Sequence, residues 1–165
     1  MSEKILCVLA GYDEETEKYL SGIQSNIYSS GFVGRHTKNL LQHITIGTFE
    51  TEKEQELIKK IKKVSNEYDA FDITFNHIGV FSGSNVLFIA PDPNSKLLEL
   101  KEVFGSSYNW TPHTTMLIDE PQVIYKALPI VVNNFKSFQG QVKSIHLYEF
   151  WPTRHICSVI LSKRK

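Results

Sequence analysis

His43-Ile44-Thr45-Ile46 and the matching His113-Thr114-Thr115-Met116 each lie within an apolar run of the kind that forms a β-strand. Side chains on a strand alternate between its two faces, so each histidine shares a face with the threonine two positions on. Two His-x-Thr patterns in a chain of this length arise by chance on the order of once in a hundred sequences. The pair therefore indicates one site that contains two imidazoles and two hydroxyls.

The first half of the sequence predicts the order strand, helix, motif strand, helix, strand. Residues 5–10 form a buried strand pattern, and Asp13 is a typical helix N-cap. Thr51-Glu52-Lys53-Glu54 matches the capping box of a second helix. Residues 71–75 alternate as a half-buried strand should, and residues 79–83 contain the glycines of a turn region.

The second half predicts the same order around the second motif. A helix is expected from about Asn94 to Phe104, where Gly105 ends it. Another helix begins near Pro121, which suits a first helical position, and Pro129 is expected to kink or split it. The other strands of this half are expected at residues 86–89, 142–150 and 155–161.

This shared order indicates an ancient duplication with halves at residues 1–82 and 83–165. A pseudo-twofold axis between two lobes would bring the two motif strands together. We therefore expect one bilobal domain over residues 1–165.

Composition limits the partners that the chain can bind. Its 165 residues, 41% of them apolar and 22% charged, are typical of a soluble folded protein. Eighteen basic and eighteen acidic side chains leave no net charge, so no overall field would hold long duplex nucleic acid. A nucleic-acid partner is expected to be a strand end or a small fragment.

Two single cysteines, Cys7 and Cys157, lack the spacing of a metal site or a disulfide framework and favour a reducing, cytoplasmic setting. No apolar run approaches the roughly 18 residues that a membrane span needs. We expect a monomer that associates with no membrane.

Catalysis by this pair of motifs follows from the chemistry of imidazole. Hydrolysis of a phosphoester requires one group to take a proton from water and another to give a proton to the leaving oxygen. His43 and His113, with an ordinary pKa of about 6.5, suit both tasks and predict a bell-shaped pH dependence, but the sequence does not assign the roles. Thr45 and Thr115 would donate hydrogen bonds to the non-bridging phosphate oxygens.

Other hydrolytic motifs do not occur in the sequence. It contains no His-Glu-x-x-His or Cys-x-x-Cys metal pattern, no phosphate-binding P-loop and no Gly-x-Ser-x-Gly elbow. We therefore expect neither a metal ion nor another cofactor.

Residues 39–47 around the first motif, and residues 110–116 with a proline before the second histidine, resemble the two motifs of the two-histidine (2H) phosphoesterase superfamily. The resemblance is to its 2′-5′ RNA ligase-like and cyclic nucleotide phosphodiesterase branches. Residues 78–81 and 86–89 are similar to the central link of that family, and residues 145–150 to its closing strand.

The resemblance implies an α+β fold with two lobes, two mainly antiparallel sheets, helices packed outside and a central cleft. It also implies hydrolysis, without metal, of 2′,3′-cyclic or 2′-5′ phosphodiesters in small RNA ends or nucleotides. Many RNA-ligase-like members carry an arginine after the second motif, where this chain has Leu117-Ile118-Asp119. Three alternatives stay open: a 2′-5′ RNA ligase, a noncatalytic binder of nucleotides or RNA ends, and a protein-interaction module with incidental histidines.

Five further residues are candidates for substrate contact. Arg35, and Arg154 together with its neighbour His155, could clamp a phosphate, although solvated loop arginines are the ordinary alternative. Phe81 and Tyr148 could stack on a base, with core packing as the alternative.

Roles are also expected for one tryptophan and three further histidines. Trp151 shares the two possible roles of Phe81, base stacking or core packing. Histidines without a threonine partner are expected to be structural or exposed, and these are His36, His77 and His146.

Overall fold

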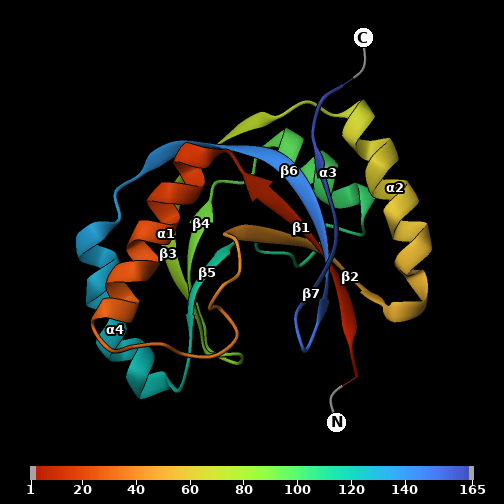
Figure 1. The fold of residues 1–165 in the computed structure, drawn as a ribbon. Helices are drawn as coiled ribbons and strands as arrows, with labels where there is room; N and C mark the ends of the chain where they lie inside the picture. The colour runs from red at the N-terminus through yellow and green to blue at the C-terminus, as the bar shows by residue number, and fades with distance from the viewer. Residues whose placement is uncertain (1–2, 164–165) are drawn as a thin grey trace.

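The computed structural model describes residues 3–163, which form four α-helices and seven β-strands (Figure 1). No helix in this range is both long and apolar enough to cross a membrane. The elements in chain order are β1 (Ile5–Tyr12), α1 (Glu14–Ser29), β2 (His43–Glu50), α2 (Glu54–Glu67), β3 (Phe71–Phe81), β4 (Val86–Pro91), α3 (Ser95–Val103), β5 (Thr114–Ile118), α4 (Pro121–Asn134), β6 (Phe138–Phe150) and β7 (Arg154–Ile160).

The seven strands form one antiparallel sheet in which β6 is shared by two halves. The first residues of β6, Phe138–Val142, pair with β3, while Val142–Phe150 pair with β1. One half of the sheet is thus β2-β1-β6-β7 and the other is β5-β4-β3-β6. The predicted antiparallel α+β class is confirmed. The two predicted sheets are joined because β6 begins four residues before the predicted strand and these residues reach β3.

Helices cover the two halves from opposite sides of the molecule (Figure 1). Helices α1 and α4 pack together beside β4 and β5, whereas α2 packs on β6 and β7. The strand pairing does not divide between residues 82 and 83, because β3 and β4 pair across that boundary. The duplication of residues 1–82 in residues 83–165 stays a prediction.

Alternation along β1 separates the hydrophobic core from the face that carries the first motif. Leu6, Val8 and Ala10 belong to the main core. Leu9 and Gly11 pair with Thr45 and His43 of β2, so these four residues share the opposite face, which we call the motif face. On α1, Leu20, Ile23 and Ile27 recur every three to four residues and form a buried apolar stripe.

Three local predictions differ from the structure. The capping box was wrong: Thr51–Lys53 form a 3₁₀ turn, and α2 has no side-chain cap. Pro129 does not split α4, because the carbonyl that loses its partner belongs to Tyr125, whose side chain is 79% exposed to water. The turn region begins after Phe81, because the glycine at position 79 stays in the strand ladder opposite Phe88.

Candidate active site

His43 begins β2 with one ring nitrogen already bonded. Its Nδ1 lies 2.7 Å from the carbonyl oxygen of Leu41, so in the neutral ring Nδ1–H donates and Nε2 is left as an acceptor. Burial lowers the pKa of His43 to about 4, although the carbonyl partner opposes this shift and the charge of His113 adds to it. His43 is therefore neutral at pH 7 and available as a base.

His113 repeats this arrangement immediately before β5. Its Nδ1 lies 2.9 Å from the carbonyl oxygen of Thr111, two residues back, as in the first motif. Burial lowers the pKa of His113, and the hydrogen bond to Thr111 opposes the shift. The rings of Phe81 and Phe88 lie 4.7 and 5.3 Å from the imidazole, centroid to centroid, so the surroundings of His113 are aromatic.

Direct hydrogen bonds hold the two motif segments together. The Thr114 hydroxyl donates to the carbonyl oxygen of His43 at 3.1 Å. The indole N–H of Trp110 donates to the carbonyl oxygen of Thr45 at 3.3 Å. The buried Tyr12 hydroxyl bonds to the Thr114 hydroxyl in turn. Residues distant in sequence thus place the two His-x-Thr motifs beside each other, as the chemistry requires.

A buried chain of amides from α1 supports the same junction. The Gln24 amide nitrogen donates to the carbonyl oxygen of Met116 at 3.1 Å, and the Gln42 amide nitrogen donates to Gln24 Oε1 at 2.7 Å. The backbone N–H of Gln42 donates to the Glu17 carboxylate at 3.1 Å. Sequence reasoning missed these positioning residues, because a single glutamine or glutamate gives no local sign that its side chain bonds inside the protein.

A cavity of about 130 Å³ lies at the junction, with His43 from β2 and Thr115 from β5 in its wall. Drug-sized ligands usually occupy roughly 300–1,000 Å³, so this volume suits a single chemical group. The stacked rings of His36 and Trp151, with centroids 4.4 Å apart, also line it. The other lining residues are Gln24, Thr37, Leu40, Leu41, Gln42, Ile118 and Phe150.

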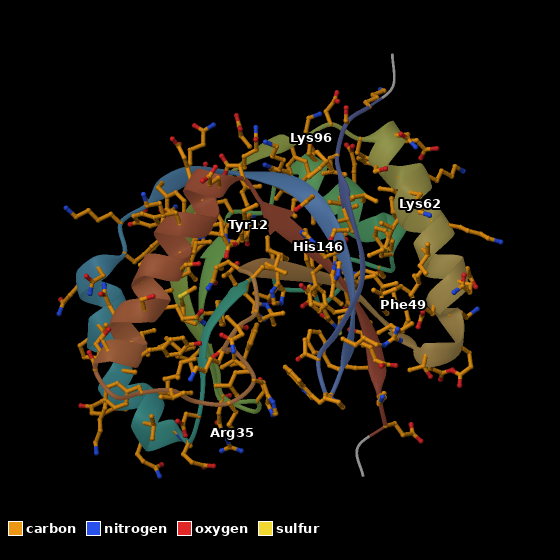
Figure 2. The ribbon with its side chains drawn as sticks, viewed as in Figure 1. Tyr12, Arg35, Phe49, Lys62, Lys96 and His146 are labelled. Atoms are coloured by element: carbon orange, nitrogen blue, oxygen red, sulfur yellow. The ribbon has the colours of Figure 1, made fainter. Side chains whose placement is uncertain are left out.

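The two arginines predicted to clamp phosphate are paired with carboxylates. Arg35 bonds to Glu120 and lies at the edge of the molecule in Figure 2. Arg154 bonds to Glu149 at 3.0 Å and to Glu54 at 2.6 Å, which ties the start of β7 to β6 and α2. The structure does not bring either arginine to the motifs, and phosphate binding by them stays a prediction.

The two predicted stacking residues lie on different sides of the site. Phe81 packs edge-on against His113. Tyr148 lies on β6, stacked on Phe150 at 5.8 Å and edge-on to His155 at 5.1 Å. Contact of either ring with a base stays a prediction.

The structure places His146 near the first motif, and the expectation that it is structural or exposed stays a prediction. Leu9 pairs with both Thr45 and His146, which puts His146 on the motif face. Its ring lies over Gly11, where an added Cβ would come within 2.5 Å of Nε2. Burial, and then the charges of His155 and His43, lower the pKa of His146 to about 4.

The sequence does carry a signal for His146. Ser144, His146 and Tyr148 alternate along one face of a predicted strand, and the residues between them, Ile145 and Leu147, belong to the core. The other two histidines behave as expected: His77 is exposed and bonds to Asp92, and His36 is exposed and stacks on Trp151.

Comparisons with known proteins agree with this geometry. The family model of the 2′-5′ RNA ligase superfamily matches residues 35–150, more than half of the chain, and both motifs lie inside the match. Escherichia coli LigT complexed with ATP is similar at 19% identity and a TM-score of 0.65, and the match covers 98% of this chain and 100% of that one.

Two other solved structures share the fold with the same coverage. They are E. coli LigT complexed with 3′-AMP, at 16% identity and a TM-score of 0.60, and TT0787 of Thermus thermophilus, at 13% and 0.63. Comparison with curated proteins finds no significant match. The family match and the paired His-x-Thr motifs together show that the chain belongs to the 2′-5′ RNA ligase superfamily of two-histidine phosphoesterases.

Proposed function

We propose that this protein is a metal-independent phosphodiesterase that hydrolyses 2′,3′-cyclic phosphodiesters of small RNA ends or nucleotides. One observation carries the proposal: His43 and His113 each bond a backbone carbonyl through Nδ1, and no hydrogen bond within residues 3–163 occupies Nε2 of either ring. Each of these histidines is followed two residues later by a threonine. Such a set can move two protons and stabilise a phosphoryl group at once.

In the proposed reaction, the neutral imidazole of His43 takes a proton from a water molecule as the water oxygen bonds to phosphorus. The bond from phosphorus to one ribose oxygen breaks, and that oxygen takes a proton from His113. An anionic phosphate beside His113 favours its protonated form, which offsets the effect of burial. Thr45 and Thr115 donate to the non-bridging oxygens, where negative charge develops.

The surroundings of the site support a nucleotide substrate. Phe81 and Phe88, with Val86 and Ala90, form an apolar cluster beside His113 against which a base can pack. E. coli LigT, which shares this fold, has been solved with ATP and with 3′-AMP. We also propose that the protein acts as a monomer in the cytoplasm, because one chain supplies both motifs and Cys7 and Cys157 are unbridged.

Ligation of 2′-5′ ends is the second candidate, and the family match favours it. The same two imidazoles would serve if a ribose hydroxyl replaced water as the nucleophile. Cleavage of 2′-5′-linked oligonucleotides is the reverse of that reaction and can be assayed alongside hydrolysis of cyclic phosphates.

The test is turnover of 2′,3′-cyclic nucleotides and 2′-5′-linked oligonucleotides in EDTA by the wild type, His43→Ala and His113→Ala. We expect activity that chelation leaves unchanged and that each substitution lowers by at least about a hundredfold. His77→Ala is the matched control, since His77 is exposed and bonds to Asp92. No turnover by folded wild type, together with measurable nucleotide binding, would contradict hydrolysis and favour the noncatalytic binder.

A further inference from the structure

Four polar side chains on β6 and β7 have no part in the proposed hydrolysis. Ser144 Oγ lies 2.8 Å from Nε2 of His146, whose Nδ1 lies 2.6 Å from Ser158 Oγ. Ser158 Oγ is also 2.6 Å from Nε2 of His155. The four residues form one hydrogen-bonded chain across β6 and β7, which we call the serine–histidine chain.

The inner end of this chain lies on the same face as the first motif. Gly11 pairs with His43 on one side and with Ser144 on the other. Two strand spacings, about 10 Å, therefore separate the backbones at His43 and Ser144. Only the missing side chain of Gly11 leaves room for the ring of His146 and the hydroxyl of Ser144 between them. His146 accordingly lies near the centre of the molecule in Figure 2.

One carboxylate of the neighbouring strands shares this face: Glu50 of β2 pairs with Ile5, which lies four residues, about 13 Å, along β1 from the Leu9 that pairs with His146. The titratable groups around His146 are His43 on β2, His155 on β7 and Tyr148 on β6, while β1 contributes Leu9 and Gly11. Glu149 alternates to the opposite face and is paired there with Lys4 and Arg154. Around His146 the face thus offers hydroxyls and imidazoles without an adjacent carboxylate, a composition that suits an anion.

Protonation of His146 would turn the hydroxyls toward a ligand. A neutral imidazole must accept a hydrogen bond at one nitrogen, so one of its two serines points its hydrogen at the ring. A protonated ring donates from both nitrogens, and both serine hydroxyls then accept from it. The hydrogen of Ser144 becomes free to donate to an anion, and so does that of Ser158 when Nε2 of His155 is the donor in their hydrogen bond. The anion in turn stabilises the positive charge of the ring.

We propose that Ser144, His146, His155 and Ser158 form a subsite for a second phosphate of the substrate, one that is not hydrolysed. This inference rests on the proposed function, because the scissile phosphate is assumed to lie between His43 and His113. The aromatic surroundings of His113 favour the base on that side, which leaves the serine–histidine chain for the charged part of the substrate.

Binding of the second phosphate takes up one proton. Without an anion, burial and the nearby histidine charges hold the pKa of His146 at about 4. A bound phosphate raises this pKa. Between the pKa of His146 with phosphate bound and its pKa without phosphate, the preference for a substrate with the second phosphate should therefore grow by up to tenfold for each unit by which the pH falls.

The experiment compares uridine 2′,3′-cyclic phosphate with the same molecule carrying a 5′-phosphate, at pH 8, 7 and 6. For the wild type we expect kcat/KM to be at least about tenfold higher with the 5′-phosphate at pH 6 and less so at pH 8. His146→Asn should abolish this preference and leave kcat/KM for the unphosphorylated substrate within about threefold of the wild type. His77→Asn is the matched control and should retain the preference.

Substitutions of exposed members keep the test valid if His146→Asn does not fold. Ser158→Ala and His155→Asn alter residues that are exposed on β7 and should reduce the preference in the same way. Equal kcat/KM for the two substrates in the wild type overturns the inference. An equal loss on both substrates in the variants also overturns it, because a purely structural role predicts that result.

Two further measurements separate the possible failures and the sources of the phosphate. If neither substrate is turned over, the proposed function fails, and calorimetry with uridine 3′,5′-bisphosphate and uridine 3′-phosphate decides the subsite alone. Tighter binding of the bisphosphate by the wild type but not by His146→Asn would support it, and equal binding would overturn it.

A dinucleotide ending in a 2′,3′-cyclic phosphate presents the second phosphate as a diester, and a preference for it over the 5′-phosphorylated mononucleotide identifies an RNA end.

Discussion

The surroundings of His43 and His113 differ although their backbone hydrogen bonds match. Each imidazole is oriented by the carbonyl two residues before it. On the His43 side, the neighbouring strands carry the serine–histidine chain. On the His113 side, they carry the rings of Phe81 and Phe88. Both histidines thus hold the Nδ1–H tautomer, but His43 does so on the polar side of the site and His113 on the aromatic side.

This difference suggests how two equal motifs acquire unequal roles. His43 has its pKa lowered by burial and further by the charge of His113, so it strongly favours the neutral form of a base. The pKa of His113 is lowered by burial, and its backbone hydrogen bond to Thr111 opposes that shift. We therefore assign His43 as the base and His113 as the acid.

The largest expected effect tests this assignment with an activated substrate. A p-nitrophenyl leaving group needs no proton, so loss of the acid matters little when this group departs. His113→Ala should lower kcat at least about a hundredfold on a 2′,3′-cyclic nucleotide but less than about tenfold on a p-nitrophenyl phosphodiester. His43→Ala should impair both reactions. The opposite pattern would exchange the two roles.

The threonines should have effects of similar size on both sides of the site. Thr45→Val and Thr115→Val remove a hydroxyl with little change in volume, and each should lower kcat by about a hundredfold with a small change in KM. Thr74→Val, on the exposed face of β3, is the control. A loss confined to KM, or seen with one threonine only, would show that the hydroxyls do not act as an equivalent pair.

Local periodicity was enough to predict some of these residues. His43 and Thr45 share a face because strand side chains repeat every two residues, and the stripe of α1 is buried because helical residues recur every three to four. Such patterns need no knowledge of which strand pairs with which. The motifs and the helix positions could therefore be predicted from the sequence.

Residues that depend on strand pairing could not be predicted in this way. His146 lies beside the first motif only because β1 lies between β2 and β6 and has a glycine at position 11. Arg154 pairs with Glu149 and Glu54, partners that only the tertiary structure supplies. The continuous β6, which joins the two expected sheets, is another consequence of long-range pairing.

Burial of His43 should make the folded state sensitive to acid. The pKa of His43 is about 4 in the folded protein and 6.5 for an ordinary histidine, so the unfolded chain takes up a proton first as the pH falls. Stability should decrease from about pH 6.5 to about pH 4, and His43 should account for about 3 kcal/mol of that loss. Urea unfolding of wild type and His43→Gln at pH 7, 5.5 and 4 measures it, with His77→Gln as the control. Equal losses in all three proteins would contradict this origin.

The smallest expected effect concerns the aromatic side of the site. Phe81→Ala removes a ring that packs against His113, so water reaches the imidazole and its pKa should rise toward the ordinary 6.5. Because the acid must be protonated, kcat/KM should then begin to fall at a higher pH than in the wild type. Histidine titration by NMR and a pH–rate profile measure the two shifts, with the exposed Tyr125→Ala as the control. If the titration of His113 moves while the alkaline limb does not, then His113 is not the acid, and the aromatic side of the site serves the base of the substrate alone.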